Sequence, residues 1–165
     1  MKFDSSRFFF ATVALIVISL LSFGYYLEHA LGLSPCPLCV LQRYCYYGIL
    51  TSALIGLSTF NFRSLLFLSN LFLMGFSALG ITLAGRQVWL QRFSSKESME
   101  CIPSFDFLVN NLPLDQIIYK IYSGGTDCAN VDWVFLGGSI ADWSTLCFVS
   151  FFFGTFKHVI SSKNN

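Results

Sequence analysis

The sequence predicts an all-α membrane protein, a bundle of four transmembrane helices with a long outer loop that contains a short amphipathic interfacial helix. Of its 165 residues, 55% are hydrophobic and 12% are charged, which is about half the charged fraction of an average soluble domain. The mean hydropathy is +0.63. The length favours a single domain, residues 1–165. The net charge of +1 provides no basic surface, so we exclude a nucleic acid as a partner.

Four stretches have about the 20 apolar residues that a helix needs to cross the hydrocarbon core. We predict the spans at about residues 8–26, 44–60, 65–85 and 143–160. No charge falls in the middle of a span, which disfavours a proton relay or a voltage sensor. The first span follows Lys2 and Arg7, as a signal sequence would. Its apolar run is longer than that of a signal sequence and no small-x-small cleavage site follows, so we interpret it as a retained anchor.

The charges of the connecting segments predict the orientation, because cytoplasmic segments carry an excess of lysine and arginine. Basic residues precede the first span, occupy the turn after the second and lie at or beyond the end of the fourth: Lys2, Arg7, Arg63, Lys157 and Lys163. Both termini and that turn are therefore predicted to be cytoplasmic. The two other segments, about residues 27–43 and 86–142, are predicted to lie outside, where irregular backbone can be solvated.

The longer outer loop has a pattern typical of a helix that lies flat on the bilayer. Pro113 precedes apolar residues at helical spacing, and Gly124-Gly125 ends the pattern. The apolar residues are Leu114, Ile117, Ile118, Ile121 and Tyr122. We therefore predict an amphipathic interfacial helix there. Trp133, Phe135 and Leu136 predict a second interfacial contact before the fourth span.

The six cysteines are the other unusual feature of the sequence. Four of them lie in the outer loops: Cys36 and Cys39, which form a C-x-x-C motif, and Cys101 and Cys128. These four share one face of the membrane, which is the oxidising one. Cys45 and Cys147 fall inside predicted spans, where we expect them to pack as small apolar residues.

The C-x-x-C motif lies at the expected start of the second helix. Ser34 is a suitable N-cap and Pro35 suits the first helical position, which would place both cysteines in the first turn. A helix N-terminus stabilises a thiolate, the reactive form of cysteine. Arg43 follows Cys39 by four residues and is expected on the same face. Its charge would lower the pKa of that thiol or stabilise negative charge on a bound electron acceptor.

Other interpretations fit the same residues. C-x-x-C also occurs in structural disulfides and as half of a metal site, with Arg43 then an interfacial anchor. A zinc site would need a second such motif or a histidine pair. His29 and His158 lie on opposite sides of the predicted membrane, so we expect no metal. Cys101 and Cys128 alone favour a structural disulfide, worth about 3–4 kcal/mol. Two cysteine pairs on one face can exchange by thiolate attack, and this combination favours redox function.

Several motifs resemble those of the bacterial disulfide bond formation protein B family. They are Pro35-Cys36-Pro37-Leu38-Cys39 with Gln42-Arg43, Gly85-Arg86-Gln87-Val88-Trp89-Leu90-Gln91, Cys101, Pro113-Leu114, and Asp127-Cys128-Ala129 with Asp132-Trp133-Val134-Phe135-Leu136-Gly137. The cysteine pairs and the predicted spans follow the order of the family. The resemblance extends from about residue 8 to residue 156.

The resemblance implies an enzyme of the bacterial inner membrane whose outer loops are periplasmic. Such an enzyme reoxidises a periplasmic thiol-disulfide oxidase of the DsbA type and passes two electrons to a membrane quinone, ubiquinone or menaquinone. It implies that the reduced partner attacks a Cys101–Cys128 disulfide through Cys101. Cys36 and Cys39 would reoxidise that pair, with Cys39 facing the quinone. The resting pairing stays open, and an interloop bond such as Cys39–Cys101 is an alternative.

The resemblance also implies residues that bind the quinone. Arg43 would be the quinone-activating cation, a role that the helix spacing also allows. Gln87 stands where many relatives have histidine, and it can hydrogen-bond a quinone carbonyl without transferring a proton. Arg86 and Gln91 are weaker candidates, with interfacial anchoring as the alternative. The lipid bilayer and its quinone pool are therefore expected partners.

Two alternative functions are a paralogue dedicated to one substrate oxidase and a non-enzymatic membrane module with structural disulfides. A transporter or channel is disfavoured by the small number of spans, by their lack of charge and by the lack of an internal repeat.

Overall fold

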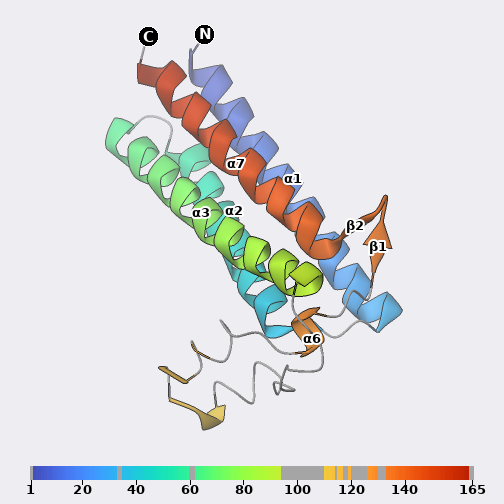
Figure 1. Cartoon of the computed structure of the whole chain (residues 1–165). Coiled ribbons are helices and arrows are strands. Elements are labelled where there is room, and N and C mark those ends of the chain that lie inside the picture. Colours follow the sequence, from blue (N-terminus) through green and yellow to red (C-terminus); the bar gives the residue numbers. More distant parts are fainter. Residues whose placement is uncertain are drawn as a thin grey trace.

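The computed structural model describes residues 2–32, 35–59, 62–93, 110–113, 115–116, 119, 126–129 and 133–163. Four long helices run side by side (Figure 1): α1 (Lys2–Leu31), α2 (Pro37–Ser58), α3 (Arg63–Phe93) and α7 (Ile140–Lys163). The short helix α6 (Thr126–Ala129) and a hairpin of β1 (Val134–Phe135) and β2 (Gly138–Ser139) lie at the end of the bundle away from both chain termini. The hairpin adds two short strands to a fold that is otherwise helical, as predicted. Strands of two residues are too short to show the alternating pattern by which a sequence predicts a strand.

Three helices of the described part of the chain are long and apolar enough to cross a membrane. The segments are Ser6–Ala30 of α1, Ser64–Phe93 of α3 and Ile140–Ser161 of α7. They contain the predicted first, third and fourth spans and extend beyond them. The predicted second span, residues 44–60, falls mostly within α2, and its crossing of the membrane stays a prediction.

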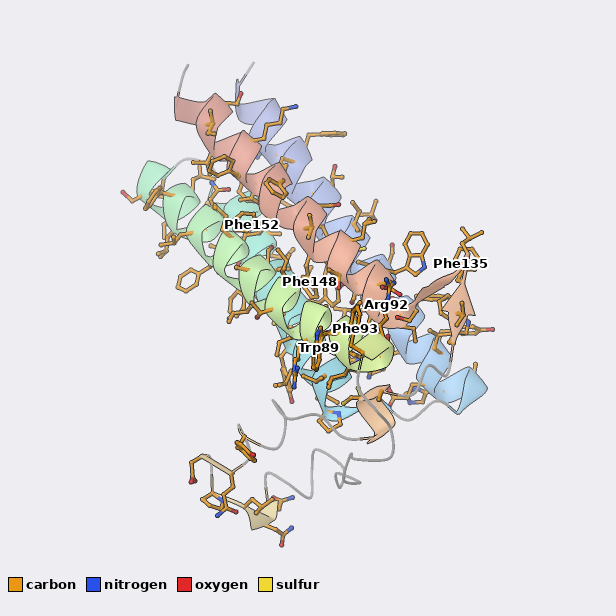
Figure 2. The ribbon with its side chains drawn as sticks, viewed as in Figure 1. Trp89, Arg92, Phe93, Phe135, Phe148 and Phe152 are labelled. Atoms are coloured by element: carbon orange, nitrogen blue, oxygen red, sulfur yellow. The ribbon has the colours of Figure 1, made fainter. Side chains whose placement is uncertain are left out.

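Apolar side chains of all four helices fill the middle of the bundle. α3 packs against α2 and α7, and α1 packs mainly against α2. The fully buried core side chains include Phe10, Val17, Ile49, Leu73 and Phe148. Phe148 of α7 lies against α3 (Figure 2), where a Cβ added at Gly80 would overlap its ring. The close approach of α3 and α7 therefore depends on the glycine at this position.

The antiparallel hairpin leads directly into α7. Its two-residue turn, Leu136-Gly137, has φ values of 51° and 81°, and this left-handed conformation matches the twist of two strands joined by so short a turn. Ser139 then caps α7. Its Oγ accepts from the Asp142 N–H at 3.3 Å, and the Asp142 carboxylate accepts from the Ser139 N–H at 2.9 Å. This capping box ties the hairpin to the helix.

Some predicted features lie outside the described residues. Among them are Ser34, Cys101 and most of the predicted interfacial helix at residues 113–122. The aromatic residues before α7 are described. The Trp133 ring stacks on Phe135 and meets the edge of Phe23 of α1, each with a centroid distance of 5.7 Å. The hairpin therefore packs against α1 as well as α7.

Candidate active site

The C-x-x-C motif forms the N-terminus of α2, but the helix starts later than predicted. Cys36 is the N-cap residue, with an extended backbone (φ −67°, ψ 161°), and Pro37 is the first helical residue. A residue before proline is sterically disfavoured in the helical region, so Cys36 cannot readily join the helix. The prediction that places Pro35 at the first helical position is therefore wrong. The Cys36 sulfur accepts a hydrogen bond from the Cys39 N–H at 3.4 Å.

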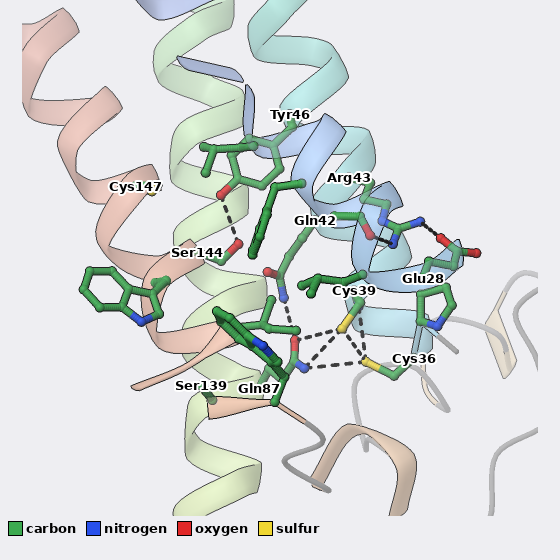
Figure 3. Close-up of a pocket in the computed structure, with 18 of the residues that line it drawn as sticks. Glu28, Cys36, Cys39, Gln42, Arg43, Tyr46, Gln87, Ser139, Ser144 and Cys147 are labelled. Atoms are coloured by element: carbon green, nitrogen blue, oxygen red, sulfur yellow. Dashed lines mark hydrogen bonds and ion pairs between the residues drawn. The ribbon is translucent and has the colours of Figure 1, made fainter. Parts of the chain in front are cut away.

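Three thiols meet at this point of the molecule. The Cys36 and Cys39 sulfurs are 2.9 Å apart, with the Cys36 thiol donating to Cys39 (Figure 3). Cys128 of α6 hydrogen-bonds to Cys36, and both residues are buried. Three of the four predicted redox cysteines therefore lie in one cluster, and the fourth, Cys101, is outside the described residues.

The two thiols of the motif differ in acidity. The pKa of Cys36 is raised because hydrogen bonds with Cys128 and Cys39 stabilise its protonated form and because it is buried. The pKa of Cys39 is lowered because its sulfur accepts hydrogen bonds from Cys36 and Gln87, which together outweigh its burial. Cys39 is therefore the more acidic thiol of the pair, and a thiolate is the nucleophilic form of cysteine.

Gln87 of α3 faces the motif. Its Nε2 donates to the Cys39 sulfur at 3.3 Å and lies 3.6 Å from the Cys36 sulfur. Gln42 of α2 donates from Nε2 to the Gln87 Oε1 at 2.7 Å. Sequence reasoning found Gln87 but assigned no role to Gln42. Its position three residues after Cys39, on the same face of a helix, was the available signal.

Arg43 is part of an ion pair with Glu28 of α1. Its Nη1 lies 2.5 Å from the Glu28 carboxylate, its Nη2 lies 3.5 Å from the Gly24 carbonyl oxygen, and its guanidinium stacks over the Tyr25 ring at 4.9 Å. The pKa of Cys39 is lowered mainly by hydrogen bonds from Cys36 and Gln87, and not mainly by the charge of Arg43. The sequence analysis missed Glu28, although it is the one acid in residues 27–43.

A cavity of about 650 Å³ adjoins the thiols and is mostly apolar. Its apolar wall comes from α1, the hairpin and α7: Leu20, Leu21, Phe23, Leu27, Trp133, Phe135, Ile140 and Trp143. Its polar wall comes from Glu28, Cys36, Cys39, Gln42, Arg43, Gln87, Gln91, Ser139, Tyr46 and Ser144. The Tyr46 and Ser144 hydroxyls hydrogen-bond to each other at 2.9 Å.

The two weaker candidates differ in position. Gln91 lines the cavity, and its Oε1 accepts from the Ser139 hydroxyl at 2.7 Å. Arg86 instead stacks over the half-exposed ring of Trp89 at 4.7 Å. Of the two cysteines in the predicted spans, Cys45 is buried in the core and Cys147 lines the cavity.

Comparison with known proteins finds one family that matches most of the chain. The family model "Disulfide bond formation protein DsbB" matches residues 6–156. Disulfide bond formation protein B of Albidiferax ferrireducens is 42% identical over 146 residues, 88% of this chain and 82% of the relative. This chain belongs to the DsbB family. The relative from Polaromonas naphthalenivorans is 42% identical over 147 residues, and that from Marinobacter nauticus is 36% identical over 149 residues. These alignments cover 88% and 87% of this chain, respectively, and 86% of each relative.

Membership of the DsbB family confirms the resemblance inferred from the motifs. The chain is accordingly a membrane oxidoreductase of disulfide bond formation. The clustered thiols and the adjoining cavity lie at one end of its bundle.

Proposed function

We propose that the protein reoxidises a periplasmic thiol-disulfide oxidase of the DsbA type and passes the two electrons to a membrane quinone, ubiquinone or menaquinone. The observation that carries this proposal is the contact between an acidic thiol, Cys39, and a mostly apolar cavity of about 650 Å³. A quinone is an apolar electron carrier that has to be reached from the bilayer, whereas the protein thiol has to be reached in water. A thiol at a helix start beside an apolar cavity can be reached both by a quinone from the bilayer and by a protein thiol from water.

The proposed electron path begins at the loop cysteines. The reduced partner attacks a Cys101–Cys128 disulfide and forms a mixed disulfide with Cys101. The partner's second thiol then releases it as a disulfide and leaves Cys101 and Cys128 reduced. Cys128 and Cys101 next exchange with a Cys36–Cys39 disulfide, which the hydrogen bond between Cys128 and Cys36 favours by proximity. When Cys36 and Cys39 close a disulfide again, their two electrons and two protons convert one quinone to a quinol.

The cavity residues suggest how a quinone would be held. Arg43 and Gln87 would place positive charge and an N–H donor at the polar wall, where negative charge develops during reduction. Gln91 would offer its amide nitrogen, since its oxygen is held by Ser139. Arg86 is the weakest candidate, because its side chain lies over Trp89.

We propose one membrane domain, residues 1–165, in the bacterial inner membrane, in which α2 also crosses the membrane and forms the second of four spans. Both chain termini lie at the end of the bundle opposite to α6 (Figure 1), the helix that carries Cys128, which supports cytoplasmic termini and periplasmic loops. The excess of basic residues in the short segments supports the same orientation.

The test uses purified protein in lipid vesicles with ubiquinone or menaquinone and a reduced DsbA-type protein, and it measures quinone reduction by absorbance. Cys39→Ser should abolish the reaction, whereas Cys45→Ala should retain it. Quinone reduction by the Cys39→Ser variant at the rate of the unmodified protein would refute the mechanism.

A further inference from the structure

A buried pair of glutamine side chains connects α2 to α3 beside the C-x-x-C motif. The Gln42 amide nitrogen donates to the Gln87 oxygen at 2.7 Å, and each residue is only 4% exposed. An amide has one acceptor oxygen and one donor nitrogen. Fixing the oxygen of Gln87 therefore also fixes the direction of its nitrogen, which lies 3.3 Å from the Cys39 sulfur (Figure 3).

The orientation of the Gln87 amide matters because its two ends act on the sulfur in opposite ways. The nitrogen end donates and stabilises a thiolate, whereas the oxygen end can only accept from a protonated thiol. The oxygen also lies 3.6 Å from the Cys39 sulfur, and the terminal torsion of glutamine is soft and roughly two-fold. Without a fixed donor for the oxygen, a half-turn of the amide would be inexpensive.

We propose that Gln42 is a positioning residue that locks the Gln87 amide with its nitrogen toward the Cys39 sulfur. This inference rests on the proposed function, in which Cys39 is the thiol that reduces the quinone. Gln42 acts through Gln87 and not on the sulfur itself. Because both amides are neutral, the lock does not titrate.

The groups near Cys39 that do titrate or carry charge come from four elements of the described chain. They are Cys36 beside α2, Arg43 and Tyr46 on α2, Glu28 on α1, Cys128 on α6 and Cys147 on α7. None of them is changed by a substitution at Gln42, so a shift in the titration of Cys39 in such a variant reports the amide pair.

The experiment measures the rate at which iodoacetamide alkylates Cys39 as a function of pH. It uses the reduced full-length protein in detergent and assigns the modified residue by mass spectrometry. Gln42→Met keeps the length of the side chain but cannot donate, and it should raise the midpoint by about one pH unit, as expected for weakening one hydrogen bond to a charged sulfur. Gln42→Glu should raise it further, because its carboxylate would attract the Gln87 nitrogen and turn the oxygen toward Cys39, and because its negative charge also disfavours a nearby thiolate.

The decisive comparison is a double-mutant cycle. In a Gln87→Met background, Gln42→Met should produce no further shift, because the residue through which it acts is gone. An equal shift in both backgrounds, or no shift in the unmodified background, would overturn the proposal. Should Gln42→Met fail to fold, Gln42→Leu, which is also neutral and cannot donate, provides the same cycle.

Ser52→Ala is the matched control. Ser52 is also buried on α2, and its hydroxyl donates to the Gly48 carbonyl of the same helix. It should leave the midpoint unchanged, and a similar shift in this variant would indicate general loosening of α2 and contradict a specific lock. Alkylation needs neither quinone nor a protein partner, so a failure of the proposed quinone chemistry would be seen separately.

Discussion

The middle of the bundle and its thiol-bearing end are built from the same helices but are packed differently. In the middle, Gly80 and Gly56 lie against the rings of Phe148 and Phe10, and the helices pack without room for a further methyl group. At the thiol-bearing end, a cavity of about 650 Å³ lies between the helices. Its polar side chains are tied to one another in pairs: Gln42 with Gln87, Arg43 with Glu28, Ser139 with Gln91, and Tyr46 with Ser144. The difference indicates that paired polar groups keep the site open while close-packed rings hold the bundle together.

Among the variants that keep all the cysteines, the largest effect on activity should come from Arg43→Gln, which removes the cation from the polar wall of the cavity. Losing one preorganised group that stabilises developing charge typically costs about 10²–10³-fold in rate, and we expect quinone reduction to fall by that factor. Glu28 would be left unpaired, but its side chain is 29% exposed and water can solvate it. The fold should therefore persist, as measured by circular dichroism.

Arg92→Gln is the matched control for this prediction. Arg92 also pairs with a carboxylate at this end of the bundle, Asp142 at 2.7 Å, but its side chain is 59% exposed. An exposed ion pair contributes little to the stability of the fold, so the rate of quinone reduction should change by less than about twofold. If both arginine variants lose activity equally, the charge of Arg43 has no special role at the cavity.

In the packed middle, Gly80→Ala should destabilise the protein without a direct effect on the site. The new Cβ would overlap the Phe148 ring, and overpacking of a core costs roughly 1–3 kcal/mol. Gly75→Ala on the same helix has open space around its Cβ, and it should gain up to about 1 kcal/mol of helix propensity. Thermal unfolding in detergent measures both. A lower melting temperature for both variants, or for neither, would contradict the packing described for Gly80.

The thiol-bearing end should also respond to pH. The pKa of Cys39 is below its ordinary value because of hydrogen bonds from Cys36 and Gln87, so its thiolate persists to lower pH than that of a free cysteine. Quinone reduction should fall about tenfold per pH unit once the pH drops below this folded pKa. The stability that the thiolate adds has the same sign: it is fully present above the ordinary thiol pKa and is lost as the pH falls through the folded value.

Rate measurements between neutral and acidic pH, with Gln87→Met as the comparison, check this prediction. The variant should lose activity at higher pH than the unmodified protein, because Cys39 then has one donor fewer. A rate that is flat or rises on acidification would contradict a thiolate at Cys39.

The two regions also differ in how far the sequence predicts them. The helices follow from apolar runs, and the Cys36 and Cys39 pair and Gln87 follow from motifs. The start of α2 was also predictable in principle, because Pro37 keeps Cys36 out of the helix. The pairing of Arg43 with Glu28 depends on which faces of α1 and α2 meet, and local spacing contains no such information. The same holds for Gln42, whose partner is 45 residues away.

The smallest effects should come from substituting the two cysteines in the predicted spans. These variants test whether the packed middle of the bundle and its thiol-bearing end function separately. Cys45 is buried in the core, so Cys45→Ala should cost about 1 kcal/mol of stability or less and leave quinone reduction unchanged. Cys147 lines the cavity, so Cys147→Ala should alter the KM for quinone more than kcat, since the substitution would change the shape of the proposed quinone site without removing a reacting thiol. Steady-state kinetics with varied quinone separates these two parameters. Loss of kcat in Cys147→Ala would mean that the electron path extends into the bundle, and the division between a packed middle and a reactive end would fail.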